Sequence, residues 1–202
     1  MKIKQQKQIK KFLIEEFGEN EGNLLFDKQE TILNQIIKNT KNKSKNKSKN
    51  KSKNQMKTLI QTILPRIALY KAMLKYGLSD EQLYQHMKKY MIDIVAKQKH
   101  LFTSKMESIP GFYSLYSNIF LKIVHTSDLW ESVQNRGENY FDVTMKKCLW
   151  HTACVENNCE KLCHLFCDVD NVTYEGLKKI GFRRTQTLGY GGNCCDFHFY
   201  KK

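Results

Sequence analysis

Apolar residues repeat at two different intervals along this chain, and the change between them limits the folds it can adopt. Over 9–17, 23–37 and 56–77 they recur every three or four residues, which is the period of an amphipathic α-helix. From Asn139 they alternate with polar residues, which is the period of a half-buried strand. Helices followed by strands favour an α+β fold over a parallel sheet. We predict N-terminal helices followed by a small antiparallel sheet with an intervening helix.

Local signals mark where several helices begin and end. Gly77 stands where a left-handed residue would end the helix over 56–77, and Pro65 is expected to kink that helix. Ser79 and Gln82 form a capping-box pattern that would start the next helix. The segment 112–124 follows a proline and a glycine, and it fits either another helix or a buried irregular segment.

Three strands are predicted in the C-terminal part of the chain. The first covers 139–148. The other two, 182–188 and 195–200, are predicted to form a hairpin across the glycine-rich loop 189–193. Between the first strand and this hairpin we expect a helix over 156–166, then a turn near Asp168 to Asn171, then a short helix through Leu177.

A lysine repeat separates the N-terminal helices from the rest of the chain. The motif KNKS occurs three times in succession from Lys41 to Ser52. Such a segment has nothing apolar to bury and so cannot offset the entropy lost on ordering it. We therefore predict a disordered, dispensable insertion at 41–55. It would lie between an N-terminal helical region, 1–40, and an α+β core, 56–202.

The same repeat carries most of the positive charge. Residues 38–57 hold nine lysines and no acidic residue, and the rest of the chain contributes only +5 of the net charge of +14. Sites for single-stranded nucleic acid usually interleave aromatic residues and arginine, which the repeat lacks. We expect no nucleic-acid partner, although binding through the lysines would show itself by a steep salt dependence.

No apolar run approaches the length of a membrane helix, and the first residues lack the apolar centre of a secretory signal. We therefore expect no membrane partner and a cytoplasmic location. In that compartment the odd number of cysteines, seven, predicts reduced thiols rather than disulfides.

The cysteines cluster near the C-terminus, and three of them share a spacing. Cys159, Cys163 and Cys167 lie four residues apart, and Asp170 follows three residues later, so a continuing helix would place all four on one face. Free cysteines also pack as small apolar residues. The face is therefore either part of the core or a site of thiol chemistry, in which nearby arginines would lower the pKa of one thiol.

Zinc binding is a further interpretation of these cysteines. Cys148, Cys163, Cys167 and Cys195, with nearby histidines, include possible ligands. The chain, however, has no CxxC pair of the kind that most structural zinc sites use. We expect no cofactor and no bound metal.

The last strands carry polar residues whose role depends on the face they occupy. Alternation places Cys195 in the core and Asp196 on the opposite face, just after the glycine-rich loop. Thr185 and Thr187 share a face of the partner strand. These polar residues either face solvent or line a pocket in which Arg184 binds a substrate carboxylate and the threonines orient its ring.

Two sequence blocks resemble a known family. LCHLFCDVD, from Leu162 to Asp170, and FRRTQTLGYGGNCCDFHF, from Phe182 to Phe199, are similar to the C-terminal signature of the L-2-amino-thiazoline-4-carboxylic acid hydrolase family. The segment ILPRIALYKAMLKYGLS over 63–79 resembles its central helix. The resemblance extends from about Met56 to the C-terminus, and the KNKS repeat departs from it. The residues at matching positions are Cys167, Asp170, Arg184, Thr185, Thr187, Gly189, Cys195, Asp196 and Phe197.

The resemblance implies hydrolysis of a small cyclic substrate, 2-amino-thiazoline-4-carboxylate, to N-carbamoyl-L-cysteine. Such a site needs a nucleophile or an activated water, a proton donor and a cation for the carboxylate. We expect Cys167 to be the nucleophile; the alternative is that Cys167 only packs and that water activated by an aspartate attacks. The other expected roles are proton transfer by Asp170 or Asp196, carboxylate binding by Arg184, and contact with the ring by Thr185, Thr187 and Cys195.

A second interpretation needs no catalysis. The C-terminal ending is also faintly similar to 4-vinyl reductase type domains, which bind small molecules. The alternative function is therefore a small-molecule-binding or metal-binding α+β module without turnover.

Overall fold

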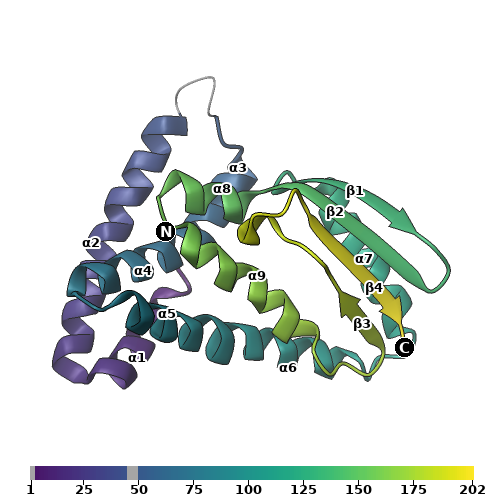
Figure 1. Cartoon of the computed structure of the whole chain (residues 1–202), viewed down its shortest axis with the longest axis horizontal. Coiled ribbons are helices and arrows are strands. Elements are labelled where there is room, and N and C mark those ends of the chain that lie inside the picture. The colour runs from purple at the N-terminus through teal and green to yellow at the C-terminus, as the bar shows by residue number, and fades with distance from the viewer. Residues whose placement is uncertain (1–2, 45–49) are drawn as a thin grey trace. The chain divides into compact units, whose positions relative to one another are not determined.

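The chain folds into two units, one that ends at Met87 and one that begins at Lys88. The computed structural model in Figure 1 describes residues 3–44 and 50–202. Helices fill the first unit, and a four-stranded antiparallel sheet lies in the second. The predicted α+β class, with helices first and a small antiparallel sheet near the C-terminus, is confirmed. None of the helices in the described ranges is long and apolar enough to cross a membrane.

The first unit depends on a close contact between its first two helices. Gly18, with a φ of 80°, makes the turn between them. Gly22 then packs directly on the backbone of Ile14, because a Cβ at Gly22 would lie 2.6 Å from the Ile14 Cα. The elements of this unit are α1 (Gln6–Phe17), α2 (Glu19–Ser44), α3 (Lys53–Thr58), a π-helical segment (Leu59–Ile63), α4 (Leu64–Tyr76) and α5 (Asp80–Lys88).

Pro65 interrupts the helical hydrogen bonds, as its sequence position suggests. Because Pro65 has no N–H, the carbonyl of Gln61 lacks its usual helical donor. The side chain of Gln5 donates to that carbonyl instead, at 2.9 Å. The break takes the form of the π-helical segment just before Pro65. The helix then continues to Gly77, whose left-handed conformation, with a φ of 96°, ends it as predicted.

Helices extend into both margins of the lysine repeat, where the sequence predicts disorder. Helix α2 runs through Ser44, and Lys41 and Lys43 in its last turn complement the negative end of the helix dipole. On the other side, Ser52 and Gln55 form a capping box that starts α3. The expected disorder is therefore wrong for these margins, because local capping and helix-dipole interactions stabilise helix there. The centre of the repeat, 45–49, lies outside the described residues.

The second unit begins with a long helical stretch. The hydrogen bonds of Ser79 and Gln82 that start α5 confirm the predicted capping box. The segment 112–124, for which two interpretations remained open, is helical. The elements are a π-helical segment (Lys89–Ala96), α6 (Lys97–Met106), α7 (Phe112–Thr126), β1 (Trp130–Arg136), β2 (Tyr140–Cys148), α8 (Leu149–Glu156), α9 (Glu160–Tyr174), β3 (Ile180–Arg183), the 3₁₀ turn η4 (Leu188–Tyr190) and β4 (Cys195–Lys201).

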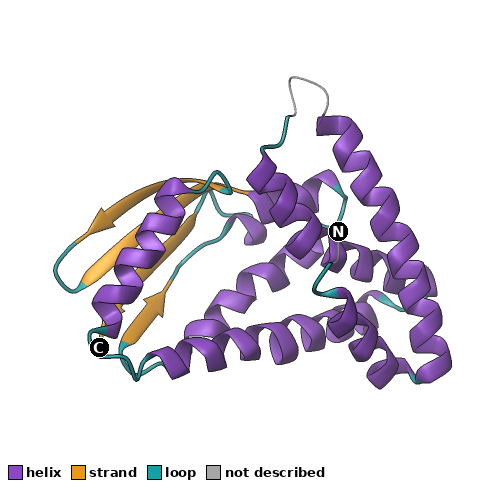
Figure 2. Cartoon of the chain, turned by 180° about the vertical axis from the view of Figure 1, so that it is seen from behind, coloured by secondary structure: helices purple, strands orange, loops and turns teal. Residues whose placement is uncertain are grey.

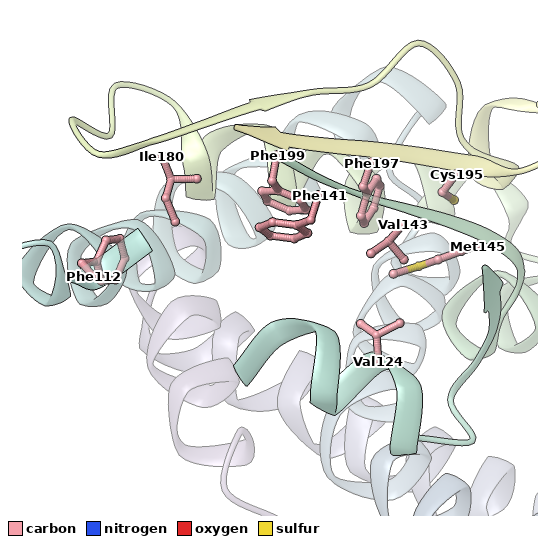
Figure 3. Close-up of a cluster of buried hydrophobic side chains, with 9 residues drawn as sticks. All are labelled: Phe112, Val124, Phe141, Val143, Met145, Ile180, Cys195, Phe197 and Phe199. Atoms are coloured by element: carbon pink, nitrogen blue, oxygen red, sulfur yellow. The ribbon is translucent and has the colours of Figure 1, made fainter. Parts of the chain in front are cut away.

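The sheet has the strand order β1-β2-β4-β3. Seen from behind in Figure 2, α7 lies across one face of it. In the register, Phe141 of β2 faces Phe199 of β4, and Val143 faces Phe197. These side chains point from the sheet toward Val124 of α7 (Figure 3) and form the core of the unit. The alternation along β2 and β4 was therefore predicted correctly.

Two local predictions are wrong, and one strand was not predicted. Strand β1 was not predicted, because it is an edge strand whose residues are at most half-buried. The expected turn at 168–171 is helical, since α9 runs on to Tyr174 through a stretch without glycine or proline. The expected strand 182–188 ends at Arg183, and the residues that follow leave the sheet.

The Gly22 contact predicts a reversal of the usual effect of alanine in a helix. Replacing an exposed helical glycine by alanine normally stabilises a protein by about 1 kcal/mol. We expect Gly22→Ala to lower the free energy of unfolding by about 1–3 kcal/mol, because the new methyl group meets backbone that cannot move aside. Urea unfolding measures this change. Asn20→Ala, at an exposed position of the same helix, is the matched control, and a stabilised Gly22→Ala variant would contradict the contact.

Candidate functional site

Helix α9 gathers three of the side chains that the sequence singled out. Because the helix is continuous, Cys163, Cys167 and Asp170 lie along one face, as their spacing predicted. Cys163 is buried, with 2% of its surface exposed, whereas Cys167 is only partly buried. The loop between β3 and β4 packs against the same helix through η4. The candidate site is therefore formed by α9 and the loop 184–194.

Three thiols in this region interact through hydrogen bonds. Cys154 on α8 and Cys167 both bond to Cys163, and these bonds lower the pKa of the Cys163 thiol although burial opposes the change. The bond to Cys163 and burial raise the pKa of Cys167, whereas a bond from Thr187 acts in the opposite direction. The pKa of Cys154 is raised in the same way. We call Cys154, Cys163 and Cys167 the thiol row; they titrate together, and Cys163 is the member whose pKa the bonds lower.

Gly189 of η4 lies directly on two of these thiols. A Cβ on Gly189 would lie 2.7 Å from the sulfur of Cys167 and 3.1 Å from that of Cys163. Only glycine lets the loop approach the helix so closely. The glycine-rich segment was predicted to form a hairpin turn, and part of it contacts α9.

Asp168 links the loop to the helix on the outer side of this contact. Its carboxylate accepts a hydrogen bond from the hydroxyl of Tyr190 at 2.8 Å and lies 3.6 Å from the guanidinium of Arg184. The Tyr190 ring stacks on His164, with 4.2 Å between the ring centres. Arg184 also donates to the backbone carbonyl of Cys167 at 2.9 Å, and only 8% of its side chain is exposed. Arg184 thus lies beside Cys167, as the predicted site requires.

The sequence analysis did not identify His164 and Asp168 as residues that contact the loop. His164 and Asp168 are four residues apart on α9, and this spacing places them on one helix face. That signal was available from the sequence. Their contact with Tyr190 was not, because it depends on how the loop folds back.

Asp196 has a different environment from the one a proton donor needs. Its carboxylate accepts hydrogen bonds from the backbone N–H groups of Thr185 and Gln186, at 3.0 and 2.8 Å, and from the Thr185 hydroxyl. Partial burial alone would raise the pKa of Asp196, but these bonds outweigh it and the pKa is lowered. The ionised carboxylate of Asp196 is an anchor, in that its hydrogen bonds hold the start of the loop, and Thr185 takes part in these bonds.

Asp170 is the carboxyl group that retains its proton more strongly. Burial raises the pKa of Asp170, although the positive charges of Lys99 and Arg184 oppose the change. It lies near two partly buried tyrosines, Tyr116 and Tyr174, whose hydroxyl oxygens are 2.6 Å apart. The two aspartates that the sequence left as alternatives therefore have pKa values shifted in opposite directions, and Asp170 is the better proton donor.

The remaining predicted residues lie close to the loop. Cys195 is buried, as its position in the strand predicted, and its sulfur accepts a hydrogen bond from the N–H of Leu188 at 3.4 Å. Thr187 is buried and caps η4. The structure thus places Arg184 and Thr187 beside Cys167, and Thr185 beside Asp196.

Within 3–44 and 50–202, no group of three or more histidine, cysteine, aspartate or glutamate side chains is arranged to hold a metal ion. The thiol row consists of free thiols that form hydrogen bonds with one another.

The opposite pKa shifts of the two aspartates predict opposite trends of stability with pH. Asp196 has a lowered pKa, so its stabilising effect is complete above the pKa of an unfolded aspartate, about 4, and is lost as the pH falls through its folded value. At pH 7 we expect Asp196→Asn to lower the free energy of unfolding by about 1.5 kcal/mol, from the loss of hydrogen bonds to a charged group. This difference from the unmodified protein is expected to shrink below about pH 4.

Asp170→Asn is the matched variant for this measurement. Because burial raises the pKa of Asp170, its ionised form destabilises the fold, and the variant is expected to be relatively more stable at neutral pH. That advantage should diminish as the pH falls and Asp170 gains its proton. Urea unfolding at several pH values tests both trends. Stability differences that do not change with pH for either variant would contradict the assignments.

Comparison with known proteins agrees with the resemblance of the two sequence blocks. The family model described as L-2-amino-thiazoline-4-carboxylic acid hydrolase matches residues 56–199. No curated protein matches significantly. Among solved structures, the Fe(II) unliganded H-NOX protein from K. algicida is 12% identical, with a TM-score of 0.35, over 100% of this chain and 97% of that one; we draw nothing from so low a score. Because the family model spans most of the chain, this protein belongs to the L-2-amino-thiazoline-4-carboxylic acid hydrolase family.

Proposed function

We propose that this protein opens the ring of a small cyclic C–N substrate, of which 2-amino-thiazoline-4-carboxylate is the type, to give N-carbamoyl-L-cysteine. The name of the family to which the chain belongs supports this reaction class. The observation that supports the proposal in this chain is the arrangement on α9, where a hydrogen-bonded pair of thiols and a carboxyl with a raised pKa share one helix face. This arrangement supplies a nucleophile and an acid on the same rigid element.

The attacking atom in this proposal is the sulfur of Cys167. Cys167 is the more exposed of the two thiols on α9 that bond to each other. Cys167 also bonds to its neighbour Cys163, and its proton is released to solvent as the attack proceeds. The alternative in which water attacks directly needs an ionised aspartate as base, and burial, which raises the pKa of Asp170, disfavours its ionised form.

The bond changes follow from the substrate. The sulfur of Cys167 bonds to the carbon of the C=N group, and the electron pair of that double bond moves to the ring nitrogen, which takes a proton from Asp170. The exocyclic amino nitrogen then forms a C=N bond to this carbon as the bond to the ring sulfur breaks, and the ring sulfur leaves with the electron pair and takes from solvent the proton that Cys167 released. Water finally adds to the same carbon and returns one proton to Asp170. The bond to Cys167 breaks as the carbonyl forms, and the second proton of the water goes to the Cys167 sulfur, so that the net reaction consumes one water.

Binding of the substrate carboxylate is assigned to Arg184. Its guanidinium donates to the Cys167 carbonyl and lies near Asp168, which keeps the group close to the nucleophile. Of the two threonines that the sequence proposed for ring contact, Thr187 bonds to Cys167 and Thr185 bonds to Asp196. We therefore assign ring contact to Thr187, and we assign to Thr185 and Asp196 the task of holding the loop.

The direct test is to incubate the purified protein with 2-amino-thiazoline-4-carboxylate and to follow N-carbamoyl-cysteine by mass spectrometry. We expect product from the unmodified protein and a loss of at least about 100-fold in turnover for Cys167→Ser, because the hydroxyl is a far weaker nucleophile. Cys194→Ser is the control, since Cys194 is partly exposed but not part of the thiol row.

Each outcome of this test has a distinct meaning. Binding of the thiazoline acid without product would replace the proposal by a small-molecule-binding module. Near-normal turnover by Cys167→Ser would exclude this thiol as the nucleophile and favour attack by water. A loss in Cys194→Ser as large as that in Cys167→Ser would show that the effect is not specific to the site.

A further inference from the structure

The turn η4 covers two thiols that would otherwise face the loop side of α9. Gly189 lies against the sulfurs of both Cys163 and Cys167, and 2% of Cys163 is exposed. A reagent can reach Cys163 from this side only when the turn moves away. Access to the thiols is therefore a property of the turn as well as of the helix.

The turn is built as a small unit with its own hydrogen bonds. The backbone N–H groups of Tyr190 and Gly192 donate to the carbonyl of Thr187, at 3.1 and 2.9 Å, and that of Gly191 donates to Leu188. Because these bonds lie within the turn, the turn can change its position without breaking them. On its N-terminal side, the Asp196 anchor fixes the preceding residues to β4.

One contact that holds this unit against α9 lies on the outside of the molecule, and the bond between Thr187 and Cys167 is another. Tyr190 is 53% exposed, yet its hydroxyl donates to Asp168 and its ring stacks on His164. An exposed hydrogen bond of this kind contributes little and exchanges readily with water. The surface position of the contact therefore favours local opening over a permanently closed turn.

We propose that the turn Leu188–Tyr190 is a cover over a reactive thiol site, that the bond from Tyr190 to Asp168 holds it closed, and that small electrophiles reach Cys163 only when the cover opens, which also makes Cys167 more accessible. The inference shares Cys167 with the proposed function but is tested without its substrate. With iodoacetamide as the electrophile, the sulfur forms a bond to the CH₂ carbon, the C–I bond breaks, and iodide leaves with the electron pair. The proton of the thiol goes to solvent.

The first variant removes the hydrogen bond between Tyr190 and Asp168 and keeps the stacking of the ring on His164. Tyr190→Phe loses the hydroxyl that bonds to Asp168 but keeps the ring over His164. Labelling with iodoacetamide, followed at each cysteine by mass spectrometry of peptides, is expected to become about three- to tenfold faster at Cys163 and Cys167, as the loss of one hydrogen bond implies. Tyr140→Phe, at the exposed start of β2, is the matched control and is expected to label at the unmodified rate.

The second variant acts on the contact itself. Gly189→Ala places a methyl group where the sulfur of Cys167 lies and so forces the turn away from α9. It is expected to accelerate labelling at the same two cysteines. Cys154, which is buried at 0% exposure, is the internal reference for unfolding of the whole region and is expected to keep its rate.

The outcomes decide between the cover and its alternatives. Unchanged labelling of Cys163 and Cys167 in both variants would overturn the cover. An equal rise at Cys154 would also overturn it, because the thiols would then be exposed by general unfolding. Faster labelling in a protein that does not turn over the thiazoline acid would leave the cover in place and remove only the proposed substrate.

Discussion

The carboxylate of Asp196 determines where the loop of the candidate site goes. It accepts the N–H groups of Thr185 and Gln186, which would otherwise continue the pairing of β3 with β4. The strand therefore stops at Arg183, and the chain turns toward α9 instead of forming a tight hairpin. Every contact of Arg184, Gly189 and Tyr190 with the helix follows from this change of direction.

The loop and the helix together create a chemical environment that neither has alone. Arg184 and Asp168 place opposite charges near Cys167, and Gly189 closes the thiols off from one side. Within this enclosure, hydrogen bonds from the two other thiols lower the pKa of Cys163, and burial raises the pKa of Asp170. A ring-opening addition to C=N needs a nucleophile and an acid, and the thiols and this carboxyl lie on adjacent turns of one helix.

Much of the fold was predictable because it depends on local periodicity. The apolar stripes located the helices, and the alternation along 139–148 and 195–200 located two strands. The burial of Cys195 followed from this alternation, which places it on the same face of the strand as Phe197 and Phe199. Edge strand β1 has no comparable pattern. The alternation over 182–188 was misleading, because an aspartate from another strand takes the backbone donors that a ladder would need. Likewise, the contact of Gly189 with the thiols joins residues far apart in sequence, and spacing cannot show it.

The thiol row, joined by hydrogen bonds at Cys163, is expected to release one proton more readily than an isolated thiol does. A pH titration of thiolate absorbance in the ultraviolet measures this directly in the unmodified protein and in Cys163→Ser. We expect one thiolate to form well below about pH 8.5, the ordinary pKa of cysteine, and we expect this thiolate to be absent from the variant. Identical titrations of the two proteins, with every thiol ionising only at or above the ordinary value, would contradict the account.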